Sequence, residues 1–219
     1  MEPSTSRANS IDADKPADKP EIICIGQSVI DCITSGIDHS SLQNRSARAD
    51  RISLSAGGDA VNEGIVLSSL GHKVKVSGLI GDDPAGKLIR ICLAEKGVDP
   101  SGLTVRKDIS TVVADIIAEN DGARRSINSK AIALGGYAVA PAVIEDGVKL
   151  VSLASLFRAP LNDPQAVYLL ARKAKENGAI LCADTKVPVF QDLKLDNFRK
   201  TLELIDYIFP NETEAAFFS

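Results

Sequence analysis

The chain has 219 residues, of which 44% are hydrophobic and 25% charged, with a net charge of −4 and an isoelectric point near 5.3. This length is enough to bury one substantial hydrophobic core, so one main domain is the default expectation. Nucleic acids and anionic membranes attract clustered Lys and Arg, and an acidic chain gives no electrostatic reason to expect either as a partner. Small molecules and proteins remain as candidate partners.

The beginning of the chain predicts a disordered tail over residues 1–20, because it is rich in Ser, Asp, Lys and Pro and has little that could pack. It also lacks the apolar block of a secretory signal, and no apolar run approaches the roughly 20 residues that span a bilayer. We therefore expect a cytoplasmic protein whose ordered part covers residues 21–219. The cysteines are expected to be reduced core residues, since none has CxxC spacing: Cys24, Cys32, Cys92 and Cys182.

Strand and helix patterns alternate along the rest of the chain. The apolar run 22–25, closed by Gly26, is typical of a strand buried on both faces of a parallel sheet. Residues 34–54 are polar and irregular. Further helices are predicted over 59–70, 84–96, 164–177 and 195–204, and strands over 73–76, 150–156, 179–183 and 207–209. Such alternation favours an α/β domain with a parallel sheet covered by helices on both faces.

Apolar spacing also predicts which faces of the first two helices point inward. These residues are Val61, Ile65, Val66 and Leu70 in the first helix, and Leu88, Ile91 and Cys92 in the second. Residues 111–118 and 123–129 flank Asn-Asp-Gly at 120–122, which predicts a β-hairpin. The hairpin and the segment 34–54 are candidates for a small β-structured appendage.

A glycine pair precedes the first clear helix, in the sequence Ser-Ala-Gly-Gly-Asp-Ala-Val-Asn at 55–62. Gly57 and Gly58 would let the backbone approach a ligand closely, beside free N–H groups at the helix start. The alternative is a tight loop with a glycine N-cap. Asn62 adds an amide that offers both a donor and an acceptor to a polyol.

Three polar residues follow strands at the carboxyl ends where open α/β sheets usually bind ligands. Asp31 lies six residues after Ile25, and its carboxylate could accept hydrogen bonds from two sugar hydroxyls. An Asx turn or a cap explains it equally well. Asp184 and Lys186 come just after a predicted buried strand and could face the same site, or belong to an ordinary loop.

Two further motifs lie at predicted helix starts. Gly-Asp-Asp-Pro-Ala-Gly at 81–86 lacks the spacing of a phosphate loop, and we interpret Asp82 or Asp83 as the cap of the helix that Pro84 opens. Asn211 and Glu214 are three residues apart after the last strand. They could organise hydrated Mg²⁺ beside phosphates, or form a capping box.

Taken in order, these segments resemble the ribokinase-like, or PfkB, family of carbohydrate and nucleoside kinases. The resemblance runs from about residue 21 to the end of the chain. It is carried by the strand end at 25–26 with Asp31, the glycine pair with Asn62, the 81–86 motif, and Pro-Asn-Glu-Thr-Glu-Ala at 210–215. It implies a three-layer α/β/α sandwich with a small β-sheet lid, formed near residues 34–54 and 111–129, over a sugar site.

The resemblance also implies the chemistry, which is ATP-dependent phosphorylation of a sugar hydroxyl with Mg²⁺. Asp31, Gly57, Gly58 and Asn62 would bind the substrate, while Asn211 and Glu214 would help to position Mg²⁺ and phosphates. Members of the family carry, further along, a Gly-Ala-Gly-Asp-like segment with an anion hole and the general base. This chain stops at Ser219 before such a segment, so no catalytic residue is assigned and we expect the chain alone to be inactive, with weak ATP binding.

The leading hypothesis is therefore a PfkB-like sugar kinase that is incomplete at the C-terminus and holds the substrate-binding half. Asp-Thr-Lys at 184–186 departs from the Asp-Pro-Asn of many relatives and leaves the substrate subclass open. A nucleoside kinase is the nearest rival, although only 4% of the residues are aromatic. A non-catalytic sugar-binding remnant, with a homodimer formed through the lid strands, is the rival from another class. A dinucleotide-dependent oxidoreductase is more distant, because the first strand connection has no GxGxxG.

Overall fold

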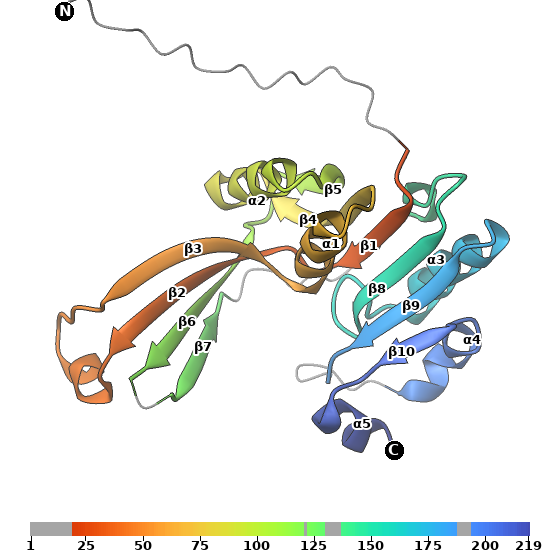
Figure 1. Cartoon of the computed structure of the whole chain (residues 1–219). Coiled ribbons are helices and arrows are strands. Elements are labelled where there is room, and N and C mark those ends of the chain that lie inside the picture. The colour runs from red at the N-terminus through yellow and green to blue at the C-terminus, as the bar shows by residue number, and fades with distance from the viewer. Residues whose placement is uncertain (1–18, 121, 130–136, 188–193) are drawn as a thin grey trace, which may run out of the picture.

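The computed structural model describes residues 19–120, 122–129, 137–187 and 194–219. Residues 1–18 of the predicted tail lie outside the described residues. Two sheets organise the chain (Figure 1). None of the helices in the described part is long and apolar enough to span a membrane.

The larger sheet has six parallel strands in the order β10-β9-β8-β1-β4-β5. The strands are β1 (Ile22–Gly26), β4 (Val74–Gly81), β5 (Asp99–Arg106), β8 (Leu150–Leu156), β9 (Ile180–Thr185) and β10 (Tyr207–Phe209). Every residue of β1 and β4 is buried, as expected of central strands covered on both sides. We call this sheet and its helices the body.

Helices cover both faces of the body sheet. Alternate residues of β1 divide between two hydrophobic clusters, with Ile23 and Ile25 in one and Ile22 and Cys24 in the other. The first cluster contains α3 (Pro164–Glu176) and η3 (Leu195–Phe198), and the second contains α1 (Asp59–Ser69) and α2 (Pro84–Glu95). The predicted three-layer α/β/α arrangement is confirmed.

The second sheet has four strands in the order β3-β2-β6-β7 and projects from the body (Figure 1). Its strands are β2 (Val29–Ile37), β3 (Arg51–Gly57), β6 (Val112–Glu119) and β7 (Arg124–Asn128), and η1 (His39–Gln43) lies between β2 and β3. β2 and β6 are parallel, and both outer pairs are antiparallel. We call this unit the projecting sheet.

Register separates the two faces of the projecting sheet. One row across the four strands is Ser55, Asp31, Ala114 and Asn128, and the next row, on the opposite face, is Leu54, Cys32, Asp115 and Ile127. Asp31 therefore lies on a mostly polar row. The opposite face carries apolar side chains that are largely exposed.

Asp83 ties the projecting sheet to the body. It caps the N-terminus of α2 by accepting from the Gly86 N–H at 2.8 Å, and it also accepts from the backbone N–H and the hydroxyl of Thr111. Thr111 immediately precedes β6. The expectation that an aspartate in the 81–86 motif caps this helix is confirmed, with Asp83 as the cap.

Several sequence-based expectations need correction. Residues 34–54 are not irregular throughout, because β2 continues to Ile37 and β3 begins at Arg51. The helix expected over 195–204 divides into η3 and α4 (Arg199–Leu202). The strand β5 was not expected. The remaining elements are η2 (Pro141–Val143) and α5 (Glu212–Phe218).

The inward faces of the first two helices match expectation only in part: Val61 is buried, and Ile65 and Leu88 pack against the second cluster. In α1 the buried residues are Ala60, Val61 and Gly64, whereas Val66 and Leu70 are exposed. Close packing explains this result, since a Cβ on Gly64 would lie 2.6 Å from Cγ2 of Val76. In α2 the buried residues are Gly86, Ile89 and Leu93, and Ile91 is exposed. Of the four free cysteines only Cys24 is fully buried.

Candidate functional site

Asp31 and the glycine pair meet where β2 and β3 leave the body. A Cβ on Gly57 would lie 2.1 Å from Oδ2 of Asp31, so any other residue there would displace this carboxylate from its position. Gly58 has φ of 89°, and a Cβ there would lie 2.5 Å from the carbonyl oxygen of Gln27. The structure thus brings together two motifs that are 26 residues apart in the sequence.

Burial raises the pKa of the Asp31 carboxyl, against the lowering effect of Arg124 in β7, and the nearby Asp59 raises it further. Asp31 is partly exposed, so its carboxyl is accessible from solvent. Gly58 is the N-cap of α1, and its carbonyl accepts from the Asn62 N–H at 2.9 Å in the first turn. The exposed Asn62 therefore lies one helical turn from the glycine pair.

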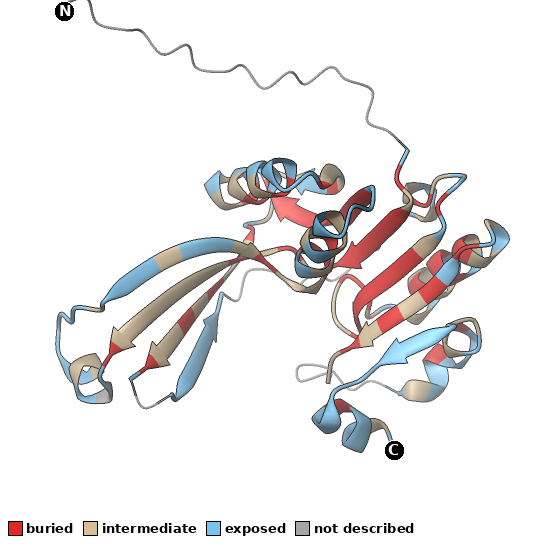
Figure 2. Ribbon diagram, viewed as in Figure 1, coloured by how far each residue is buried: buried red, intermediate tan, exposed pale blue. Residues whose placement is uncertain are grey.

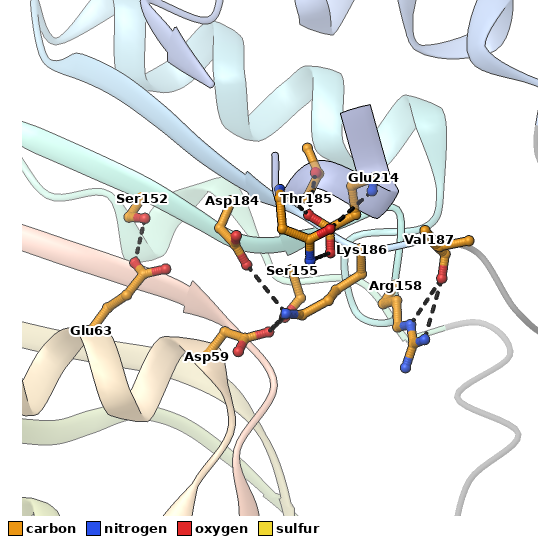
Figure 3. A network of polar contacts seen from close by, with 11 residues as sticks. Asp59, Glu63, Ser152, Ser155, Arg158, Asp184, Thr185, Lys186, Val187 and Glu214 are labelled. Carbon is orange, nitrogen blue, oxygen red and sulfur yellow. Dashed lines mark hydrogen bonds and ion pairs between the residues drawn. The ribbon is translucent and has the colours of Figure 1, made fainter. Parts of the chain in front are cut away.

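A second polar group joins α1 to the ends of β8 and β9 (Figure 3). Nζ of Lys186 lies 3.4 Å from Asp59 and 3.8 Å from Asp184, so one ammonium bridges two carboxylates. Asp59 also accepts a hydrogen bond from the Ser155 hydroxyl. Burial raises the pKa of Asp184, Lys186 lowers it, and Asp59 raises it. Asp184 belongs to β9 rather than to the loop after it.

Glu63 was not singled out in the sequence, yet it is the most strongly perturbed carboxyl of the site. Oε2 of Glu63 accepts from the hydroxyl of Ser152 at 2.5 Å (Figure 3). Burial raises the pKa of Glu63 to about 7, while the Ser152 hydrogen bond opposes the rise and Asp184 adds to it. In the sequence, the only indication that Glu63 belongs to this site is its position four residues after Asp59, on the same face of a helix.

Asn211 and Glu214 form the capping box of α5, so this alternative is confirmed. Glu214 is buried and accepts from the Asn211 N–H at 2.9 Å, from Nδ2 of Asn211 at 2.8 Å and from the Thr185 hydroxyl at 3.1 Å. Thr185 lies between Asp184 and Lys186. Glu214 is thus connected to the polar group at the end of β9, and its role toward Mg²⁺ stays a prediction.

The carboxylates of this site are spread over several elements. Nowhere in the described part of the chain do three or more His, Cys, Asp or Glu side chains gather closely enough to hold a metal ion. The oxygens of Glu214 are engaged by protein donors.

A carboxylate packed against a glycine turn and a helix start, near the carboxyl edge of a parallel sheet, is an arrangement typical of sites for small polar ligands in α/β folds. The family model described as pfkB family carbohydrate kinase matches residues 19–219. The chain belongs to the pfkB carbohydrate kinase family.

A curated relative is similar in sequence, and solved structures are similar in fold. A ribokinase of Haemophilus influenzae is 28% identical over 162 residues, which cover 73% of this chain and 49% of that protein. The structure of Arabidopsis thaliana ribokinase complexed with ribose and ATP has a TM-score of 0.72 at 20% identity, covering 90% of this chain and 62% of the other. Halothermothrix orenii fructokinase has a TM-score of 0.69 at 20% identity, covering 89% and 69%. The chain spans about half the length of the curated relative.

Proposed function

We propose that this chain provides the acceptor-binding part of an ATP-dependent sugar kinase. The observation that supports the proposal most strongly is the contact between Gly57 and Asp31, because it places a carboxylate beside the glycine turn and the first turn of α1. Asp31, Gly57, Gly58 and Asn62 would bind the hydroxyl groups of the sugar. A carboxylate can accept two such hydrogen bonds, and the helix start supplies N–H donors.

ATP and Mg²⁺ would supply the transferred phosphoryl group and neutralise its charge. The contribution of this chain lies in positioning, through Glu214, which holds Asn211 and Thr185 next to Asp184 and Lys186. A sugar hydroxyl held beside Asp31 would be oriented for transfer. Orientation of this kind accounts for a large share of the rate enhancement in phosphoryl transfer.

A sugar is preferred to a nucleoside because none of the described residues proposed to bind the substrate, namely Asp31, Gly57, Gly58 and Asn62, is aromatic. Phe157, at the end of β8, packs against Phe198 and Phe218 with ring centroids 5.1 Å and 4.9 Å apart. Those rings are engaged with one another. Recognition of a base would favour an aromatic surface for stacking.

The projecting sheet is proposed to act as a lid, and its apolar face to associate with a second copy of the chain. Ile52, Leu54 and Ile127 are 67%, 60% and 60% exposed on that face. Large apolar side chains grouped on one exposed sheet face are typical of contact surfaces. The opposite face, which carries Asp31, would remain free for the sugar.

A thermal-shift assay tests the acceptor proposal, with D-ribose, D-fructose and adenosine as probes, each with and without Mg·ATP. A sugar at 100 times its dissociation constant should stabilise the folded chain by about 2.7 kcal/mol. Asp31→Asn should reduce that shift. Asp115→Asn is the matched control, since Asp115 lies on the opposite face of the same sheet. A shift with adenosine but with neither sugar would contradict the proposal.

A further inference from the structure

Two carboxylates on α1 reach two hydroxyls of β8. Asp59 and Glu63 are one helical turn apart, so both lie on the same face of the helix. Glu63 accepts from Ser152 at 2.5 Å, and Asp59 accepts from Ser155. Figure 3 shows the two contacts side by side, with α1 on one side and β8 on the other.

Both serines are buried, and Ser155 is completely inaccessible. A buried hydroxyl needs a partner, because leaving it unpaired carries the full cost of removing it from water. The carboxylates of α1 supply those partners. The hydrogen bonds therefore fix the rotation of α1 about its axis and its position along β8, which apolar packing alone would define less sharply.

Glu63 is surrounded by other titratable groups. From the elements packed against α1 these are Cys24 of β1, Cys182 and Asp184 of β9 and Lys186, while Asp59 lies on its own helix. The charged residue of β4, Lys75, is paired with Glu145 and Asp99, and that of β3 is Arg51 at the far end of the strand. Glu63 thus has two acidic neighbours and one basic one.

We propose that Glu63 is a positioning residue of the acceptor site: together with Asp59 it fastens the first two turns of α1 to β8 and so holds Gly58 and Asn62 in place. What Gly58 and Asn62 bind rests on the proposed function. That Glu63 holds them does not, since it follows from the contacts of α1 with β8.

The position of α1 should then depend on pH. A neutral Glu63 tolerates burial and still accepts from Ser152. An ionised Glu63 is partly desolvated and is repelled by Asp184 and Asp59. Opening of α1 relieves that penalty, so the helix should open more readily above neutral pH than below it.

Amide hydrogen exchange of the whole chain tests this without any ligand. Protection of residues 62–66, whose amides are hydrogen-bonded within α1, should fall roughly tenfold between pH 6 and pH 8 after correction for the intrinsic rate, since each pKa unit relieved on opening corresponds to a factor of ten. Glu63→Gln keeps an acceptor for Ser152 and cannot ionise, so its protection should be independent of pH and exceed that of the wild type at pH 8. Glu63→Ala should lower protection at both values.

Ser69→Ala is the matched control, because Ser69 donates only to Ile65 at the far end of the same helix. It should keep the pH dependence of the wild type. The proposal is overturned if wild-type protection changes less than about twofold between the two pH values. It is also overturned if Glu63→Gln shows the same pH dependence, which would assign the titration to another group.

Calorimetry with D-ribose separates this inference from the proposed function. If D-ribose binds, Glu63→Ala should weaken binding about tenfold or more and Glu63→Gln should restore it at neutral pH. If D-ribose and the other sugars do not bind but the exchange pattern holds, the sugar proposal fails and the positioning role of Glu63 stands. If all variants bind the sugar equally and show the amide exchange of the wild type, only the positioning role of Glu63 is contradicted.

Discussion

The body and the projecting sheet use opposite principles of β structure. In the body, β1 and β4 are buried along their whole length between two layers of helices, whereas the strand residues of the projecting sheet are mostly half-buried or exposed (Figure 2). The body strands are held by apolar contacts on both faces. The projecting sheet is held by its ladder of backbone hydrogen bonds and by its attachment at Asp83 and Gly57. Stability should therefore reside in the body, and adaptability in the projecting sheet.

The largest expected effect is the loss of a buried leucine from the body. Leu153 is fully buried in β8, and Leu153→Ala should lower the free energy of unfolding by about 3 kcal/mol through lost apolar contacts and a residual cavity. Leu54→Ala in β3, where the side chain is exposed, should change it by less than about 0.5 kcal/mol. Chemical denaturation measures both. Equal losses would show that the two sheets share stability evenly.

A smaller loss is expected at the junction. Asp83→Ala removes three acceptor contacts, one of which is the cap of α2, and it should cost about 1–2 kcal/mol and speed amide exchange in β6. Asp82→Ala is the control, since Asp82 is exposed. Unchanged exchange in β6 would mean that Asp83 does not anchor the projecting sheet.

The stabilising contribution of Asp83 at this junction should depend on pH in a defined direction. Burial pushes the pKa of Asp83 upward, but hydrogen bonds from Gly86 and Thr111 outweigh it and leave the pKa below its usual value. Its stabilising contribution is therefore present at neutral pH and is lost as the pH falls through the lowered pKa. Asp83→Asn should flatten the acid limb of the stability profile, and an unaltered limb would contradict this account.

Two glycine substitutions separate ligand contact from backbone strain. Gly57→Ala should weaken sugar binding at least about tenfold because the new methyl group displaces the Asp31 carboxylate. Gly71→Ala should cost about 1 kcal/mol of stability through its φ of 92°, and it should leave binding unchanged because nothing lies within 4 Å. Calorimetry and denaturation of both variants check the pair. Equal losses of sugar affinity in the two variants would show that Gly57 has no special role in binding.

The smallest expected change in stability comes from the exposed face of the projecting sheet. Ile52→Lys combined with Leu54→Lys should reduce self-association in sedimentation velocity while shifting the unfolding free energy by no more than about 0.5 kcal/mol. Val66→Lys, at an exposed apolar position of the body, should leave association unchanged. Equal effects of the two replacements would move the contact surface away from the projecting sheet.

The sequence predicted the body better than the projecting sheet, for a physical reason. Strands covered on both faces are continuous apolar runs, so β1 and β8 could be recognised directly. β5 escaped because Pro100 and Gly102 interrupt it, and its place at the sheet edge tolerates both. β2 escaped because its half-buried positions include the polar residues Thr34 and Ser35.

The candidate site divides in the same way. Asp31 and the glycine pair carried local signals, and the structure brings them into contact. Glu63, Ser152 and Ser155 carried no such signal. A glutamate in a helix usually faces solvent, and a serine within an apolar run is read as an ordinary strand residue. Only the packing of α1 on β8 makes them partners.

The central place of β1 in the body sheet also governs how the chain reaches its native state. β1 pairs with β4, about fifty residues further along the chain. It also pairs with β8, where the last pair is Gly26 with Ala154. Such long-range parallel pairing must close large loops before it gains stability, which slows folding. During synthesis β1 leaves the ribosome early and has one flank unpaired until β8 follows, so nascent chains should be aggregation-prone and benefit from chaperones.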